Sequence, residues 1–183
     1  IIACLVGSEM CIRDSTSALD WHANQASSYE RAPLIWLHGV KGTAGSCTSW
    51  IDMQAAYRDL PQSIKRELAD VEITLGYKSG SYSESEFFVE HHAEDRPFKL
   101  VHTNDAGKTG LYFPFLQIFG MVGYEEHDFK QTMDWLIEHV LQDKYRYDHH
   151  WEDGDVVISE QWLTIHKRHE FMDMSHRVLH RIA

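Results

Sequence analysis

Two histidines and an asparagine in this chain are spaced so that they could bind one metal ion. His22 and Asn24 are two residues apart, and His166 lies far along the sequence. Alternate residues of a strand point to the same side, and imidazole is the commonest metal ligand in proteins. We therefore expect His22 and position 24 to contact a metal together. His166 would reach it from a strand or loop of a facing sheet.

Two arginines near the end of the chain could bind an anion beside that metal. Arg177 and Arg181 are four residues apart, so on a strand both side chains would face the same side. The guanidinium group is a planar fork of donors that suits a carboxylate. The competing interpretation is that both are ordinary surface arginines.

Composition excludes several classes of protein. The 183 residues carry a formal net charge of -11, which argues against a nucleic-acid binder, because such proteins need Lys and Arg against phosphates. No apolar run approaches the length of a membrane span, so we expect no membrane partner. Cys4, Cys11 and Cys47 lack the spacing of a zinc site, which favours a reducing, cytoplasmic setting. Homo-oligomer formation stays open.

The elements that must position these residues are mainly strands. Expected strands cover Leu19–Asn24, Pro33–Val40 (nearly all apolar, hence buried), Phe98–Thr103, Leu111–Phe115, Asp155–Ser159 and Met174–Ile182. Expected helices begin near Asp52 and Pro61, and a third runs from Phe129 to Leu141. The polar stretch Lys78–Pro97 reads as a solvated insertion or a lid over the substrate. The predicted fold is mainly β with helical insertions, a double-stranded β-helix of the jelly-roll or cupin-like type.

The first residues do not fit this pattern. Ile1–Ser15 (IIACLVGSEMCIRDS) lacks the positive start of a signal peptide and resembles translated adapter sequence. We expect residues 1–15 to be non-native and residues 16–183 to form one jelly-roll domain that is incomplete at its N-terminus.

Six motifs in order resemble the taurine/2,4-D dioxygenase family. They are WHAN (21–24), GSCTSW (45–50) followed by AAY (55–57), TNDAGKTGLYF (103–113), WEDGDVVIS (151–159), His166 and RVLHR (177–181). Each motif alone is weak, but the order and spacing are specific together. The resemblance implies an Fe(II)- and 2-oxoglutarate-dependent dioxygenase that acts with O₂ on a small anionic molecule and releases succinate and CO₂.

The resemblance also implies a role for each matching residue. His22 and His166 match the iron-binding histidines, with position 24 as the third ligand. Thr48 and Arg177 match the residues that bind the far carboxylate of 2-oxoglutarate. Arg181 matches an arginine that faces the acidic group of the substrate.

Position 24 departs from the family, which has Asp there. An amide oxygen offers only a dipole to a hard cation, so we expect weaker metal binding. Asn24 could still bind the metal or a water, the site could be degenerate, or Asp20 could replace the missing carboxylate. The rival functions are a catalytically inactive jelly-roll binding module and a zinc-dependent cupin enzyme.

Overall fold

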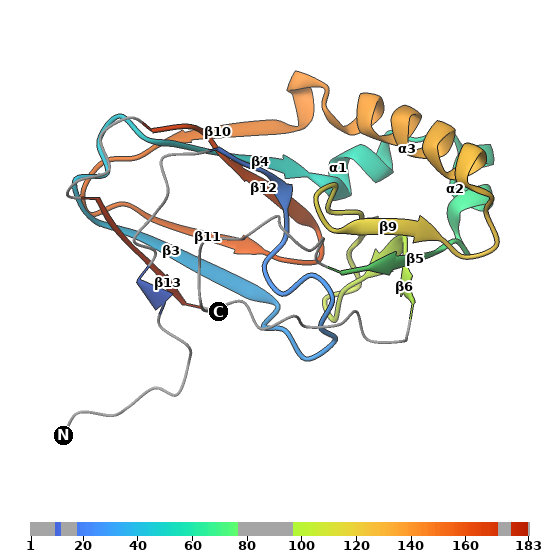
Figure 1. The fold of residues 1–183 in the computed structure, drawn as a ribbon, viewed down its shortest axis with the longest axis horizontal. Coiled ribbons are helices and arrows are strands. Elements are labelled where there is room, and N and C mark those ends of the chain that lie inside the picture. The colour runs from blue at the N-terminus through green and yellow to red at the C-terminus, as the bar shows by residue number, and fades with distance from the viewer. Residues whose placement is uncertain (1–9, 12–17, 77–96, 172–176, 183) are drawn as a thin grey trace.

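Two four-stranded antiparallel sheets form the part of the molecule that holds the candidate site. The computed structural model describes residues 10–11, 18–76, 97–171 and 177–182. In the first sheet the order is β1 (Met10–Cys11), β13 (Val178–Ile182), β3 (Leu34–Lys41) and β11 (Val156–Glu160). In the second the order is β10 (Arg146–His150), β4 (Cys47–Asp52), β12 (Thr164–Arg168) and β2 (Leu19–His22). The sheets lie one above the other in Figure 1, as the predicted double-stranded β-helix requires.

A small core fills the space between these sheets. It contains five buried side chains drawn from both sheets and from the residue that follows β10: Ile35, Leu37, Trp50, Trp151 and Leu179. β3 is only half buried, because Ile35 and Leu37 face this core while Trp36 is 46% exposed. The expectation that this strand is almost wholly buried is therefore wrong. One face of an antiparallel sheet packs on the core and the other can remain outside.

The helices form a second layer with three short strands. α1 (Met53–Arg58), α2 (Gln62–Leu68) and α3 (Glu126–Val140) lie beside the sheet β6 (Phe98–Lys99), β5 (Glu72–Leu75) and β9 (Ile118–Met121), as Figure 1 shows. A hairpin of β7 (Val101–Thr103) and β8 (Thr109–Leu111) completes this half, and the short helix η1 (Asp143–Tyr145) follows α3. The core of this helical half is the larger of the two cores in the molecule. It includes Trp21, Ile51 and Ile165 from the second four-stranded sheet.

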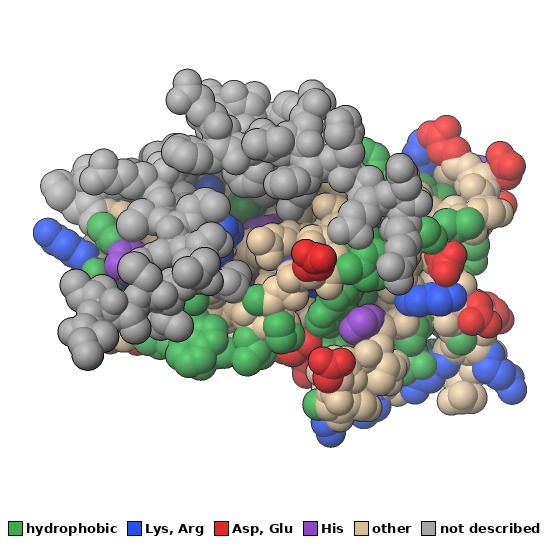
Figure 2. Space-filling model, turned by 90° about the horizontal axis from the view of Figure 1, so that it is seen from below, with side chains coloured by type: hydrophobic (Ala, Val, Ile, Leu, Met, Phe, Trp, Pro, Cys, Tyr) green, Lys and Arg blue, Asp and Glu red, His purple; other side chains and the backbone are tan. Residues whose placement is uncertain are grey.

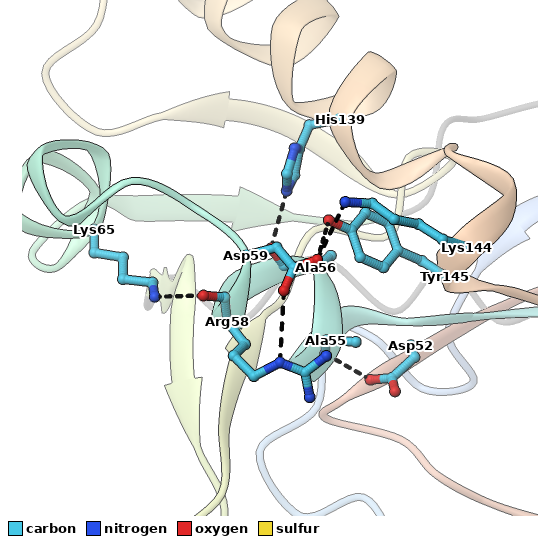
Figure 3. A network of polar contacts seen from close by, with 9 residues as sticks. All are labelled: Asp52, Ala55, Ala56, Arg58, Asp59, Lys65, His139, Lys144 and Tyr145. Carbon is cyan, nitrogen blue, oxygen red and sulfur yellow. Dashed lines mark hydrogen bonds and ion pairs between the residues drawn. The ribbon is translucent and has the colours of Figure 1, made fainter.

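Local signals explain where the helices begin and how they are joined. As expected, the Asp52 side chain caps α1 by accepting from the Ala55 N–H at 2.8 Å. α1 is joined to α3 by His139, whose Nε2 donates to the Ala56 carbonyl at 2.9 Å (Figure 3). It is joined to η1 by the Tyr145 hydroxyl, which donates to Asp59, at the end of α1, at 3.0 Å. The hydrogen bonds therefore join α1, which directly follows β4, to α3 and η1 within the helical half.

Several predicted boundaries differ from the structure. β2 ends at His22 instead of Asn24, and the strand expected over Phe98–Thr103 is interrupted at Leu100. The strand expected over Leu111–Phe115 is wrong except at its first residue, because β8 runs from Thr109 to Leu111. The expected lid, Lys78–Pro97, and the beginning of the last strand fall outside the described residues except at Pro97. Among the described residues, no helix is long and apolar enough to cross a membrane.

Candidate metal and cosubstrate site

His22 and His166 lie side by side. They are paired neighbours on the antiparallel strands β2 and β12, and their ring centroids are 4.2 Å apart. The prediction placed them on facing sheets, which is wrong, because β12 inserts between β4 and β2 in a single sheet. The two residues are 144 positions apart in the sequence, but strand pairing makes them direct neighbours, so both imidazoles come from one sheet.

The hydrogen bonding of His22 fixes which nitrogen could bind a metal. Its Nδ1 lies 2.7 Å from the carbonyl oxygen of Asp20. A carbonyl only accepts, so Nδ1 carries the proton and Nε2 keeps its lone pair. Burial lowers the pKa of His22 to about 4. The pKa of His166 is held well below its usual range, first by burial and then by neighbouring charge. Both rings are neutral at pH 7, as metal ligation requires.

Gln117 holds the segment between His22 and Asn24. Its Oε1 accepts from the Ala23 N–H at 3.0 Å, and its Nε2 donates to the Ala23 carbonyl at 2.9 Å. Gln117 is only 2% exposed. It comes directly before β9, 94 residues from Ala23. No local pattern in the sequence could have identified this contact.

Asn24 lies in the turn after β2, so the strand argument that placed it beside His22 does not apply. Its Oδ1 accepts a hydrogen bond from Arg181 Nη1 at 2.9 Å, a contact that joins the second four-stranded sheet to β13 of the first. A metal on that same oxygen would lie roughly 4 Å from the guanidinium group. At that separation two like unit charges repel by about 4 kcal/mol near a protein surface. The contact with Arg181 therefore works against direct ligation by Asn24.

Asp20 does not supply the missing carboxylate. Its side chain is 60% exposed, and Oδ1 pairs with Lys167 Nζ at 3.2 Å. The described part of the chain contains no group of three His, Cys, Asp or Glu side chains placed to hold a metal ion. Asp20 therefore does not complete the metal-ligand set among the residues that the structure describes.

Thr48 lies on β4 with its hydroxyl partly engaged. Oγ1 accepts from the indole Nε1 of Trp151 at 2.9 Å, and both side chains are buried. Because the indole can only donate, the hydroxyl proton of Thr48 is left to donate to another group. A carboxylate oxygen is the kind of acceptor that this donor suits.

Arg177 comes just before β13 and is buried, with 6% exposed. Its guanidinium carbon lies 5.9 Å from the ring centre of Phe171, and that ring lies 3.6 Å from where a Cβ on Gly45 would be. Arg177 is thus close to the loop that leads into β4 and Thr48. The strand register shifts between Val178 and Leu179, so the simple rule that Arg177 and Arg181 share a face does not hold here.

The described residues offer two of the three side-chain ligands that such a divalent metal site usually has. Two neutral, buried imidazoles from adjacent strands suit such an ion, whereas the carboxylate that would complete the usual three-residue set is absent from the described residues. Buried Arg177 and Thr48 offer a cation and a hydroxyl donor for a carboxylate. The roles assigned to all six residues remain predictions.

The two packed four-stranded sheets define a double-stranded β-helix protein. The family model described as "Taurine catabolism dioxygenase TauD, TfdA family" matches residues 8–183, and the chain belongs to that family. The family uses Fe(II) and 2-oxoglutarate. This confirms the resemblance that the six motifs predicted.

Curated relatives are distant and longer. The 2,4-dichlorophenoxyacetate dioxygenase of Burkholderia sp. (strain RASC) is 24% identical over 172 residues, covering 88% of this chain and 56% of that protein. An alkylsulfatase of Acinetobacter baylyi is 24% identical over 191 residues, covering 96% and 59%. The chain therefore spans less than two thirds of the length of these relatives.

Solved structures share the fold. The structure of AAD-2 in complex with Mn(II) and N-oxalylglycine matches with a TM-score of 0.73 and 24% identity, covering 88% of this chain and 61% of that one. A taurine dioxygenase from Burkholderia xenovorans matches with a TM-score of 0.76 and 18% identity, covering 94% and 61%. These values confirm the predicted fold class.

Proposed function

We propose that this chain carries the site of an Fe(II)- and 2-oxoglutarate-dependent dioxygenase that hydroxylates a small anionic organic molecule. In that reaction 2-oxoglutarate loses CO₂ and becomes succinate, which takes up one atom of O₂. The other oxygen atom enters a C–H bond of the substrate as a hydroxyl group. The adjacent imidazoles of His22 and His166 are the single observation that carries the proposal.

Each polar residue of the site has a task in this proposal. His22 and His166 hold the metal, which together with 2-oxoglutarate supplies the oxidising chemistry when both are bound. Arg177 pairs with the far carboxylate of 2-oxoglutarate, and Thr48 donates its hydroxyl proton to the same group. Arg181, near the end of β13, attracts the acidic group of the substrate. The burial of both imidazoles keeps competing water away from the metal position.

The names of relatives guide the choice of substrates. The curated relatives include a 2,4-dichlorophenoxyacetate dioxygenase and an alkylsulfatase, so an aryloxyacetate, an alkyl sulfate and an alkyl sulfonate form the first panel. Succinate release with Fe(II), 2-oxoglutarate and O₂ is measured for each compound. Succinate that appears with the wild type and disappears in His166→Ala supports the proposal. Absence of succinate together with absence of metal retention would end it.

A catalytically inactive binding module is the second candidate. The observation that favours it is the engagement of the Asn24 oxygen by Arg181, which leaves two metal ligands from the described residues instead of three. N-oxalylglycine, bound with Mn(II) in the AAD-2 complex, separates the two candidates. Tight binding of N-oxalylglycine that needs Mn(II) supports the enzyme, and binding of organic anions without any metal supports the module.

A further inference from the structure

Four aromatic rings form one row across the second four-stranded sheet. Strand pairing places Tyr147 of β10 opposite Trp50 of β4, and Trp50 opposite His166 of β12. His166 is in turn opposite His22 of β2. The ring centroids of Tyr147 and Trp50 are 6.4 Å apart, those of Trp50 and His166 6.1 Å, and those of the two histidines 4.2 Å. The row therefore runs from the candidate metal position to an edge strand of the sheet.

One end of this row is buried and the other is exposed. His22, His166 and Trp50 are buried, whereas Tyr147 is 58% exposed. An electron passes quickly between aromatic rings at such separations, because electronic coupling falls steeply with distance. A strongly oxidising group at the imidazole pair would thus have a short path to a side chain that reductants in the solvent can reach.

Tyr147 has a partner for the proton that it must release when it loses an electron. Its hydroxyl lies 3.1 Å from Nδ1 of His149, and Nε2 of the same imidazole lies 3.1 Å from Asp155 Oδ2. A carboxylate oxygen only accepts, so Nε2 carries the ring proton and Nδ1 accepts from the phenol. The Asp155 carboxylate then attracts the positive charge that His149 gains with a second proton.

Trp50 lacks such a partner. Its indole Nε1 is buried and has no hydrogen-bond acceptor among the residues that the structure describes. An oxidised indole that keeps its proton remains strongly oxidising, so it takes an electron from a neighbour that can lose an electron and a proton together. Tyr147 is such a neighbour, and the electron vacancy passes through Trp50 and stops there.

We propose that Trp50 and Tyr147 form an electron relay that removes oxidising equivalents from the metal position when no substrate consumes them. The oxidant is a redox-active metal ion on His22 and His166 that O₂ or peroxide has oxidised. It gains one electron, Tyr147 loses one, and the phenolic proton moves to His149 Nδ1. A one-electron reductant in the solvent, with ascorbate as the probe, then restores Tyr147, and the proton returns from His149.

The relay rests on the metal position in the proposed function, and it does not need 2-oxoglutarate. The first test adds peroxide to the Fe(II)-loaded chain without 2-oxoglutarate and records the electron paramagnetic resonance spectrum after rapid freezing. We expect a radical signal that narrows when the chain carries ring-deuterated tyrosine and that is lost in Tyr147→Phe. Tyr124→Phe is the matched control, because Tyr124 is exposed and follows β9, outside the row. A tyrosyl signal that persists in Tyr147→Phe, or the absence of any such signal, would overturn the proposal.

The second test locates the oxidation damage. Peptide mass spectrometry measures the oxygen added to each tryptophan after repeated additions of peroxide. Without Tyr147 the electron vacancy stays on Trp50, so Tyr147→Phe should raise Trp50 oxidation several-fold, and ascorbate should protect Trp50 only in the wild type. Hydrophobic side chains are also exposed on the face seen in Figure 2, and Trp36 of β3, which is exposed, is the internal control. A parallel rise at Trp36 would mean that diffusing radicals cause the damage, and would overturn the relay.

His149→Leu tests the proton step. Tyr147 then has no imidazole to take its proton, so its radical should form more slowly and Trp50 oxidation should rise although Tyr147 is present. An unchanged rate would overturn the assignment of His149 as the proton acceptor.

The relay and the proposed function fail separately. A tyrosyl signal with peroxide but no 2-oxoglutarate-dependent succinate would retain the relay and reject the dioxygenase. Succinate release without a tyrosyl signal would do the reverse, and a chain that retains no iron would overturn both.

Discussion

The side-chain amide of Gln117 binds both main-chain polar groups of Ala23, the residue between His22 and Asn24. The two hydrogen bonds measure 3.0 and 2.9 Å and are buried. The neighbouring Leu116 N–H donates to the Trp21 carbonyl at 3.1 Å. The end of β2 is therefore held by a segment of the helical half, and the direction of the His22 ring depends on that contact.

Gln117→Leu should weaken metal binding without touching a ligand. The change leaves the N–H and the carbonyl of Ala23 buried and unpaired, which should lower the free energy of unfolding by at least about 2 kcal/mol. Loss of groups that orient metal ligands typically costs 10–100-fold in affinity, and we expect roughly tenfold for Mn(II). Gln142→Leu is the control, because Gln142 makes one exposed hydrogen bond, to the His139 carbonyl. Unchanged Mn(II) affinity in Gln117→Leu would contradict the role.

Acid should destabilise the metal-free protein through His22. Burial lowers the pKa of this histidine from 6.5 in the unfolded chain to about 4 in the folded one. Between these values the unfolded chain binds a proton that the folded chain excludes, so stability falls as the pH falls. The full shift corresponds to roughly 3 kcal/mol.

The measurement is urea unfolding between about pH 7 and pH 4. His22→Gln removes one of two buried histidines whose pKa is lowered, so it should reduce the slope of this part of the profile while His166 keeps its own contribution. His127→Gln, on the exposed start of α3, should leave the profile as it is. If His22→Gln and the wild type show the same slope, another group causes the acid sensitivity.

Arg177→Gln should reduce binding of the cosubstrate and leave metal binding intact. Arg177 is buried beside Phe171 and carries no predicted contact with the metal. Removing one charged partner of a carboxylate costs about 2 kcal/mol, or roughly 30-fold in affinity. The test is calorimetric titration of N-oxalylglycine into the Mn(II)-loaded chain.

Arg177→Lys refines that test. It keeps the charge but loses the planar fork, so it should recover only part of the affinity. Arg58→Gln is the control, because the Arg58 side chain is 72% exposed on α1. A parallel loss of Mn(II) affinity in Arg177→Gln would place Arg177 in a structural role.

Helices were predictable from the sequence because their signals are local. The Asp52 cap fixed the start of α1, and the apolar spacing of Met133, Leu136 and Val140 marked the buried side of α3. Strands β4 and β10 carried no such signal. β10 reads RYDHH, and its side chains are largely exposed, so hydrophobic alternation could not reveal it.

The sequence singled out candidate site residues, whose roles stay predictions, but it did not indicate how they are arranged. The motifs selected His22 and His166, but strand order places them on one sheet, and strand order depends on contacts far apart in the sequence. The Asn24–Arg181 hydrogen bond spans 157 positions and joins the two four-stranded sheets. Gln117 belongs to a different layer, so no pattern near WHAN could indicate it.

Gly39→Ala should disturb the support of Thr48 from the opposite sheet. A Cβ at this position on β3 would lie 3.1 Å from each of three atoms, which belong to Trp151, Thr43 and the carbonyl of Glu152. Two of these neighbours are rigid, because one is main chain and the other is an indole ring that is 1% exposed. Overpacking of this kind costs about 1–3 kcal/mol.

The displaced indole should also weaken its hydrogen bond to Thr48, so N-oxalylglycine should bind the Mn(II)-loaded variant several-fold more weakly. Urea unfolding and calorimetric titration check the two effects. Gly120→Ala on β9 is the matched control, because the nearest atom to its Cβ would be Thr74 Oγ1 at 3.5 Å, an ordinary contact. That variant should be neutral or slightly more stable, since alanine reduces the freedom of the unfolded chain. Equal destabilisation by the two variants would mean that the close approach of β3 to Trp151 has no special role in the site.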